Sequence, residues 1–151
     1  MPLVNRPYDT QMSDLVFHEL DPTVGYTREC INVTPPAASA PVLMGTVVFR
    51  AKSADPAAPY AVLSAAAQLV LTNEFVVVFG DHYGVQSSFV PSTIAAGSFN
   101  AVGFKRGPVQ LKDYLIKQIA QDADGANLSD AQFETLKEVL KVQDIIVEKT
   151  L

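Results

Sequence analysis

The residues best suited to chemistry in this chain of 151 residues are Asp81 and His82, with Ser87 and Ser88 a few positions later. An aspartate that orients a histidine, which takes a proton from a serine hydroxyl, is the machinery of many acyl-transfer enzymes. Here Asp81 and His82 are neighbours at the end of a run typical of a strand, so their side chains would point to opposite faces. We therefore expect no catalytic set and interpret His82 as a turn residue. An enzyme or ligand-binding domain built on these residues is kept as an alternative.

A second pattern, Asp122-Ala123-Asp124-Gly125-Ala126-Asn127, partly matches a calcium-binding loop. The loop motif requires a third oxygen ligand before its glycine and a glutamate six residues after it. Ala131 stands at the position of that glutamate. We therefore reject an EF-hand and interpret Asp122, Asp124 and Asn127 as a turn with caps between two helices.

Other signals of metal or cofactor binding are equally incomplete. The two histidines, His18 and His82, are far apart, and Cys30 is the only cysteine, so no zinc pattern and no internal disulfide can form. We expect Cys30 to be a small buried apolar residue in a strand. Neither GxGxxG nor GxxxxGK[ST] occurs in the sequence. These observations predict a protein without cofactor or metal.

The distribution of charge restricts the possible partners. A formal net charge of −5 without any run of Lys or Arg argues against nucleic-acid binding. No apolar run approaches the ~20 residues that a membrane helix needs. The polar residues near the start of the chain argue against a signal peptide. Only six charged residues lie between Glu29 and Phe104. This charge-poor section is either partly covered by neighbouring subunits or exposed as a neutral surface.

The elements that would position these residues are mainly strands in the first two thirds of the chain. The run Phe75–Phe79 is apolar and ends at Gly80-Asp81, which is typical of a buried strand. Alternating residues predict a strand over 29–34, and β-branched residues another over 44–50 with Gly45 at a bulge or close approach. Residues 60–67 fit a strand or a helix. We also expect a hairpin turn at residues 72–74, between apolar runs 69–71 and 75–79.

The last third of the chain has the spacing of helices. Pro108 can start a helix in which Leu111, Leu115 and Ile119 form an apolar stripe and which Gly125 ends. Ser129 and Gln132 then form a capping box, the signature of a second helix start. Residues 144–148 fit a final strand or an extended tail.

The first 28 residues contain three prolines and one apolar cluster, Leu15-Val16-Phe17, followed by Leu20. This cluster cannot form a core alone, so residues 1–28 are predicted to be an arm that waits for a partner, or whose apolar residues pack on their own domain. We therefore expect one α+β, mainly β domain: an extended N-terminal arm (1–28), a small β-barrel or sandwich core (29–104) and a helical annex with a final strand or tail (105–151).

Five short segments carry a resemblance when they are taken in order: Gly25-Tyr26-Thr27-Arg28-Glu29, Val42–Val47, Tyr60–Leu63, Phe75–Phe79, and Leu136–Leu140 followed by Ile145-Ile146-Val147. Together they resemble the lambda-type phage head-decoration (capsid cement) family over about half of the chain. A departure is Gln143-Asp144, where the family usually has a glycine before the tail, and residues 85–110 have no matching pattern.

The resemblance implies a non-enzymatic virion protein, made in the host cytoplasm, that sits on the outer surface of the expanded icosahedral capsid. Its implied partners are the major capsid protein and two further copies of itself in a homotrimer over three-fold and quasi-three-fold sites. Arg28 would pair with a capsid carboxylate. A tail or baseplate module is the alternative within virions. The arm residues expected to contact the shell are Leu15, Val16, Phe17, Leu20, Tyr26 and Arg28.

Overall fold

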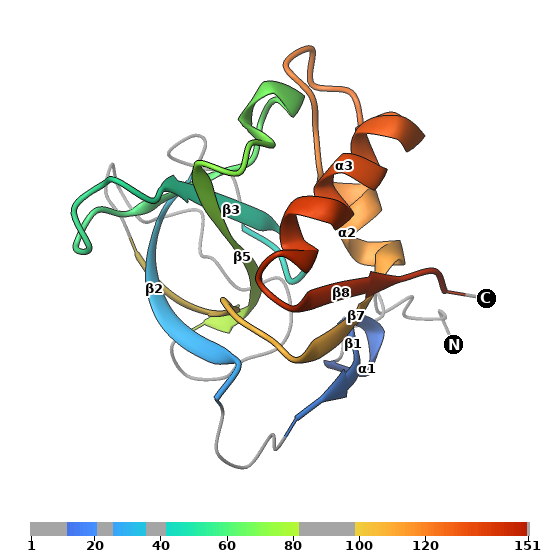
Figure 1. Ribbon diagram of the computed structural model, residues 1–151, viewed down its shortest axis with the longest axis horizontal. Coiled ribbons are helices and arrows are strands. Elements are labelled where there is room, and N and C mark those ends of the chain that lie inside the picture. Colours follow the sequence, from blue (N-terminus) through green and yellow to red (C-terminus); the bar gives the residue numbers. More distant parts are fainter. Residues whose placement is uncertain (1–11, 21–25, 36–41, 82–98, 151) are drawn as a thin grey trace, which may run out of the picture.

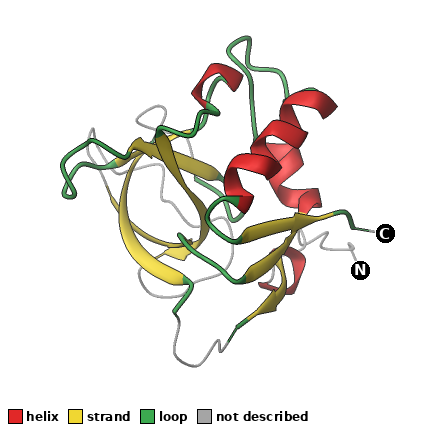
Figure 2. Ribbon diagram, viewed as in Figure 1, coloured by secondary structure: helices red, strands yellow, loops and turns green. Residues whose placement is uncertain are grey.

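Five strands close into a barrel in the order β2-β4-β3-β5-β6 (Figures 1 and 2). The computed structural model describes residues 12–20, 26–35, 42–81 and 99–150. A second, three-stranded sheet and the helices α2 and α3 lie beside the barrel, so the predicted mainly β fold with a barrel core and two C-terminal helices is confirmed. The barrel strands are β2 (Arg28–Thr34), β3 (Val47–Ala51), β4 (Tyr60–Val62), β5 (Asn73–Asp81) and β6 (Phe99–Phe104).

The run Phe75–Phe79 is completely buried within β5, as its apolar composition predicts. Antiparallel pairing to β3 on one side and β6 on the other places it inside the barrel wall. The predicted hairpin turn at residues 72–74 is wrong, because β5 already begins at Asn73 and residues 69–71 form no strand. Instead a short 3-10 helix, η1 (Ala66–Gln68), leads into a turn at Leu71-Thr72.

Alternation along β2 follows the prediction at Ile31 and Val33, which point into the core. Cys30 is exposed, however, so the prediction of a buried thiol is wrong. It shares the outward register with Asn32, which is also exposed. Strand β3 begins at Val47 and not at Met44. Gly45 has a φ of +92°, and a Cβ there would lie 3.1 Å from Leu115 Cβ, so the predicted close approach is real and involves α2.

The second sheet has the order β1-β7-β8 and consists of β1 (Val16–Glu19), β7 (Val109–Lys112) and β8 (Ile145–Glu148). Strand β7 corrects the prediction that Pro108 starts a helix. Its residues alternate, with Val109 and Leu111 buried and Gln110 and Lys112 only half-buried, so a period of two governs this segment. Helix α2 spans Asp113–Ile119 and ends well before Gly125, while β8 confirms the predicted final strand.

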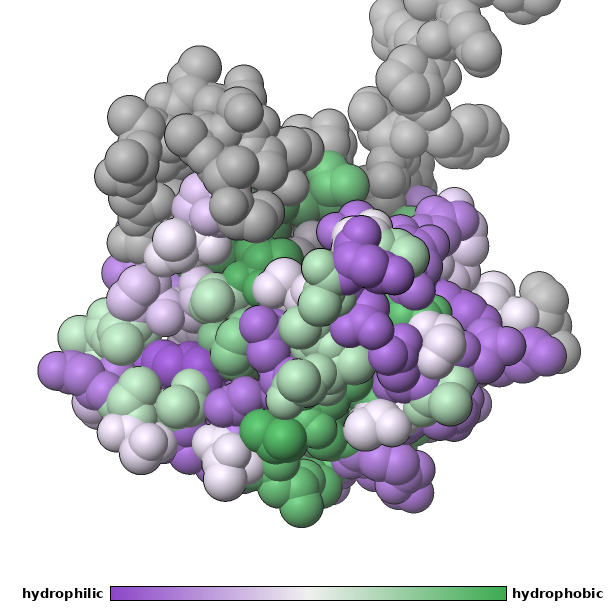
Figure 3. All heavy atoms as spheres, turned by 90° about the horizontal axis from the view of Figure 1, so that it is seen from above, coloured by the Kyte–Doolittle hydropathy of each residue, from purple (hydrophilic) through white to green (hydrophobic). Residues whose placement is uncertain are grey.

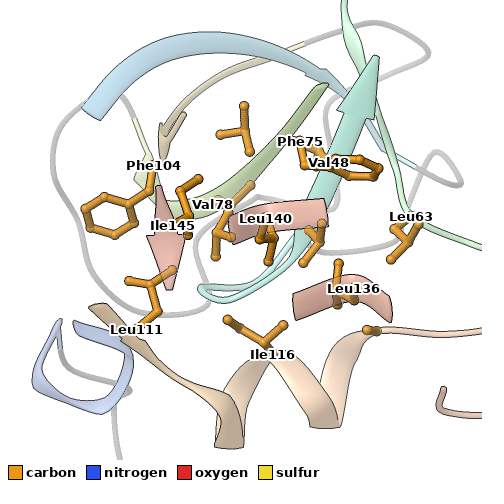
Figure 4. Close-up of a cluster of buried hydrophobic side chains, with 14 of the residues drawn as sticks. Val48, Leu63, Phe75, Val78, Phe104, Leu111, Ile116, Leu136, Leu140 and Ile145 are labelled. Atoms are coloured by element: carbon orange, nitrogen blue, oxygen red, sulfur yellow. The ribbon is translucent and has the colours of Figure 1, made fainter. Parts of the chain in front are cut away.

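Helix α3 (Asp130–Lys141) begins as its capping box predicts. The Ser129 hydroxyl accepts a hydrogen bond from the Gln132 backbone N–H, and the Gln132 side chain accepts one from the Ser129 N–H. Its buried face joins α2, the second sheet and the barrel in one core, seen in Figure 4 as Leu136, Leu140, Ile116, Leu111 and Ile145 beside Val78 and Phe104. Residues 12–20, as α1 (Met12–Leu15) and β1, are part of this domain rather than of an extended arm.

The loop between α3 and β8 is fastened to the barrel by the side chain of Gln143. Its Oε1 accepts a hydrogen bond from the Phe75 N–H at 2.8 Å, and its Nε2 donates to the carbonyl oxygens of Phe75 and Lys105, each at 2.8 Å. The Gln143 side-chain amide thus takes the place of a β6 residue in the hydrogen-bond ladder of β5, at a point where β6 has ended. Asp144 follows with a φ of +59°, a conformation that favours glycine, which is the residue expected here from the family resemblance.

Candidate functional site: the outer face of the second sheet

Three polar residues, Glu19, Thr27 and Arg28, join the end of β1 to the start of β2; we call them the clasp. The Glu19 carboxylate is buried and accepts a hydrogen bond from the Thr27 hydroxyl. Arg28 donates to both of its oxygens, from Nε at 3.0 and 3.2 Å and from Nη2 at 2.6 Å. The Arg28 guanidinium also lies over the Phe79 ring, 4.8 Å from its centroid. Arg28 therefore already has an ion-pair partner inside its own chain, contrary to the expected pairing with a capsid carboxylate.

Two other predicted contact residues also belong to the domain itself. Leu15 is completely buried in the core, and Val16 is half-buried and packs against it. Pairing of β1 with β7 brings both side chains against the rest of the core, so the alternative that the cluster packs on its own domain holds for them. Leu15 is therefore not available for contact with another protein.

Phe17, by contrast, is exposed because of an irregularity in β1. Val16 pairs with Leu111 and His18 pairs with Gln110, so the register shifts by one residue between them. This bulge leaves two consecutive residues, Phe17 and His18, exposed to solvent. The Lys112 ammonium lies 5.4 Å from the centroid of the Phe17 ring.

One face of the second sheet carries these residues together. Gln110 pairs with Ile146 and Lys112 with Glu148, so these four side chains share the face opposite to the buried Leu111, Ile145 and Val147. We call this surface the outer face.

The outer face collects exposed apolar side chains along its margin as well. Leu20 follows β1 and donates its N–H to the Pro108 carbonyl, and Tyr26 lies under the Arg106 guanidinium at 5.0 Å. Of the eight large apolar residues that are exposed in the described part of the chain, four lie on this face or at its margin, which marks it as a candidate binding surface. These four are Phe17, Leu20, Tyr26 and Ile146.

Sequence reasoning therefore found Phe17, Leu20 and Tyr26 but missed the residues that β7 and β8 contribute. The missed apolar residue is Ile146. Alternation in Val109–Lys112 and Ile145–Glu148 is the signal that could have located the sheet. The pairing of these two strands, which lie more than thirty residues apart in the chain, has no local signal.

Next to Tyr26, Glu29 forms two ion pairs at the rim of the outer face. Its carboxylate oxygens lie 3.0 Å from Lys105 Nζ and 2.9 Å from Arg106 Nη1. Burial alone would raise the pKa of Glu29, but the hydrogen bonds from Lys105 and Arg106 outweigh it and lower that pKa. Arg106 is thus held between Glu29 and the Tyr26 ring, and Tyr26 keeps a fixed place at the surface.

A polar cavity of about 310 Å³ lies on the barrel, lined by residues that include Glu29, Cys30, Arg50, Tyr60 and Lys105. The charged side chains that line this cavity have partners within the chain. Arg50 pairs with Glu74 and donates to the carbonyls of Pro56 and Ala58. Lys105 pairs with Glu29.

The ionisation of this cavity follows from the same contacts. Burial raises the pKa of Tyr60, and the hydrogen bond that its hydroxyl donates to Glu74 at 2.7 Å raises it further. Burial would also raise the pKa of Glu74, but hydrogen bonds from Tyr60 and Arg50 outweigh it and lower that pKa. Tyr60 is therefore a neutral donor and Glu74 a carboxylate near neutral pH, and both serve the local structure.

Asp122, from the partial calcium-loop pattern, has a structural role. Asp122 accepts hydrogen bonds from the backbone of Ala66 and Ala123 and from the Gln132 side chain, which lower its pKa. It is a capping residue in the turn between α2 and α3, as interpreted. Asp81 ends β5, and His82, Ser87 and Ser88 lie outside the described residues.

Within the described ranges there is no group of three or more His, Cys, Asp or Glu residues arranged to hold a metal ion. Among the same residues, no helix has both the length and the apolar character needed to span a membrane.

Comparison with known proteins gives no relative: no protein-family model, no curated protein and no solved structure matches this chain.

Proposed function

We propose that this chain is a structural virion protein that binds the outside of an expanded icosahedral capsid, as a homotrimer at three-fold and quasi-three-fold sites, and stabilises it against internal DNA pressure. The observation that carries the proposal is the outer face, where the exposed Phe17 and Ile146 lie on one small sheet with Leu20 and Tyr26 beside it. The family resemblance supplies the partner, the major capsid protein. A tail or baseplate module is the alternative, since an apolar sheet face would serve there as well.

The outer face suits reversible docking rather than chemistry. Phe17, Leu20 and Tyr26 each expose more than half of their surface. Covering such side chains contributes roughly 1 to 2 kcal/mol each, less the cost of ordering the partner. One copy would therefore bind weakly. Three copies in one assembly make the later contacts intramolecular, which can raise avidity by ~10²–10⁴.

The clasp gives this face its shape. It ties the end of β1 to the start of β2, so Leu20 and Tyr26, which lie between the clasp residues Glu19 and Thr27 in sequence, are held beside the outer face. The Tyr26-Thr27-Arg28-Glu29 segment that carries much of the resemblance thus has a structural role in presenting the docking surface. In this proposal Arg28 positions the surface, and Phe17, Leu20 and Tyr26 contact the shell.

Exchanging Phe17 and Leu20 together for serine is expected to weaken binding to expanded capsids of the encoding virus at least about 100-fold. The pair removes roughly 3 kcal/mol of apolar contact per copy, and each 1.4 kcal/mol is a factor of ten. Both side chains are exposed, so the fold should be retained. Co-sedimentation of the protein with purified expanded capsids over a concentration series measures the effect.

Tyr114→Ser is the matched control, because Tyr114 is half exposed but lies on α2 and not on the second sheet. It should bind as the unmodified protein does. Equal binding by all three proteins would refute docking through the outer face. Point substitutions suit this test better than removal of the N-terminal segment, because Leu15 and Glu19 are built into the domain.

A further inference from the structure

The wall of the barrel is weakest between β2 and β3. Strand β4 lies between them, but it has only three residues and pairs with β2 at Val33 and Thr34 alone. Within the described residues, the earlier part of β2, Arg28–Asn32, therefore pairs on one side only, with β6. The polar cavity lies along this gap, since its lining includes residues 29–32 of β2 and residues 56–58. We call the gap the seam.

The loop of residues 52–59, which leads from β3 to β4, covers the seam; we call it the 52–59 loop. In Figure 1 it forms the left edge of the molecule, whereas the second sheet lies at the lower right. Figure 3 keeps this edge at the left and shows hydrophilic residues there among weakly hydrophobic ones. Every residue of the loop is exposed or half-buried, so its movement away from the barrel would cost little apolar burial.

One side chain fastens the 52–59 loop to the barrel. Arg50 Nη1 donates to the carbonyl oxygen of Pro56 at 2.8 Å and to that of Ala58 at 3.0 Å. The hydrogen bond from the Lys52 N–H to the Thr72 carbonyl fixes only the root of the loop. Among the described residues, the remaining hydrogen bonds of the loop join its residues to one another or to the last residue of β3. Closure of the loop therefore depends on Arg50.

Arg50 is itself held in place by two neighbouring strands. Its Nε donates to Glu74 Oε1 on β5 at 2.9 Å, and its Nη2 donates to the same oxygen. The guanidinium lies over the Tyr60 ring of β4, 4.4 Å from its centroid, and the Tyr60 hydroxyl also donates to Glu74. A planar group with five donors can serve the loop and both strands at once, which an ammonium group cannot do.

We propose that the 52–59 loop is a strap that opens as a unit, and that Arg50 holds it closed over the cavity. Opening widens the seam and lets solvent reach Tyr60, which is only 2% exposed in the closed structure. Strand β5 keeps its pairing with β3 and β6, so the rest of the barrel stays folded. The inference does not rest on the proposed function, because the loop lies away from the outer face.

Hydrogen exchange of the full chain, followed by mass spectrometry of its peptide fragments, tests the inference. Arg50→Lys should speed the exchange of residues 54–58 about tenfold or more, because an ammonium group cannot keep the hydrogen bonds to Glu74 and to the loop together. The exchange of Phe75–Phe79 in β5 reports opening of the whole barrel. It should change much less, which also shows that the variant is folded.

Glu74→Gln is the second variant, since it removes the charge that orients Arg50 without altering the loop. It should speed the exchange of the loop in the same way. Glu29→Gln is the matched control, because Glu29 lines the same cavity but forms its ion pairs with Lys105 and Arg106. It should leave the exchange of the loop as it is in the unmodified protein.

Three results would overturn the inference. The first is that Arg50→Lys or Glu74→Gln leaves the exchange of residues 54–58 unchanged. The second is that Phe75–Phe79 accelerates by the same factor as the loop, which would mean that the barrel opens only as a whole. The third is that Glu29→Gln accelerates the loop as strongly as Arg50→Lys does.

Discussion

Gly107→Ala is expected to destabilise the protein by about 3 kcal/mol or more, because the added methyl group has no space. A Cβ at this position would lie 1.7 Å from the Asp144 carbonyl oxygen and 2.4 Å from its carbon. Both are backbone atoms in the loop that Gln143 fastens to the barrel, and the Gly107 N–H donates to the Gln143 carbonyl. Relief of the clash must therefore move the connection between α3 and β8. Urea unfolding followed by far-UV circular dichroism measures the loss.

Gly125→Ala is the control that separates steric clash from backbone conformation. Gly125 has a φ of +80° but nothing within 4 Å of an added Cβ, so its substitution should cost only about 1 to 2 kcal/mol. If Gly107→Ala proves no more harmful than Gly125→Ala, the close contact between residues 107 and 144 is not a feature of the folded protein.

Glu19→Gln should have the second largest effect, a loss of about 2 to 4 kcal/mol in the free energy of unfolding. The change keeps the size of the side chain but removes the charge that Arg28 faces in the clasp. Glu19 is almost completely buried and Arg28 is only 23% exposed, so water compensates the guanidinium poorly. The carboxamide also has one acceptor oxygen for the donors of Thr27 and Arg28, instead of two. Thermal and urea unfolding both report this change.

Glu29→Gln makes the same chemical change one residue beyond the clasp. The carboxylate of Glu29 is 37% exposed, so its ion pairs with Lys105 and Arg106 are screened by water, and its loss should cost no more than about 1 kcal/mol. Equal losses for the Glu19 and Glu29 variants would contradict the assignment of the clasp as a buried junction.

Local signals were sufficient where a short motif or the composition of a single run determines the element. The capping box at Ser129 predicts the start of α3, because its hydrogen bonds join residues three positions apart. The apolar run Phe75–Phe79 predicts a buried strand, because a strand covered on both faces needs apolar residues on both, and all five residues belong to the core.

The errors occurred where distant pairing decides the structure. Leu111 fits a helical stripe with Leu115 and Ile119 in sequence, but pairing of β7 with β1 and β8 makes it a strand residue. In sequence Leu15 is consistent with an exposed arm, but the pairing of β1 with β7 places it in the core. Cys30 was expected to be buried from its apolar character, but it alternates with the buried Ile31 and Val33, and this two-residue period places it toward solvent.

The candidate site was predictable only in part for the same reason. Phe17, Leu20 and Tyr26 stand out in sequence as apolar residues in a polar segment. Ile146 becomes their neighbour through the pairing of β8 with β7. Arg28 was assigned to a foreign carboxylate because Glu19, nine residues earlier, has no sequence signal that marks it as its partner.

Imaging of expanded capsids from the virus that the proposed function implies, incubated with this protein, tests the central claim most directly. Docking through the outer face predicts added density at the three-fold and quasi-three-fold positions, with β1, β7 and β8 toward the shell and the barrel away from it. Capsids that acquire no density, or density in which the second sheet faces solvent, would contradict the proposed function.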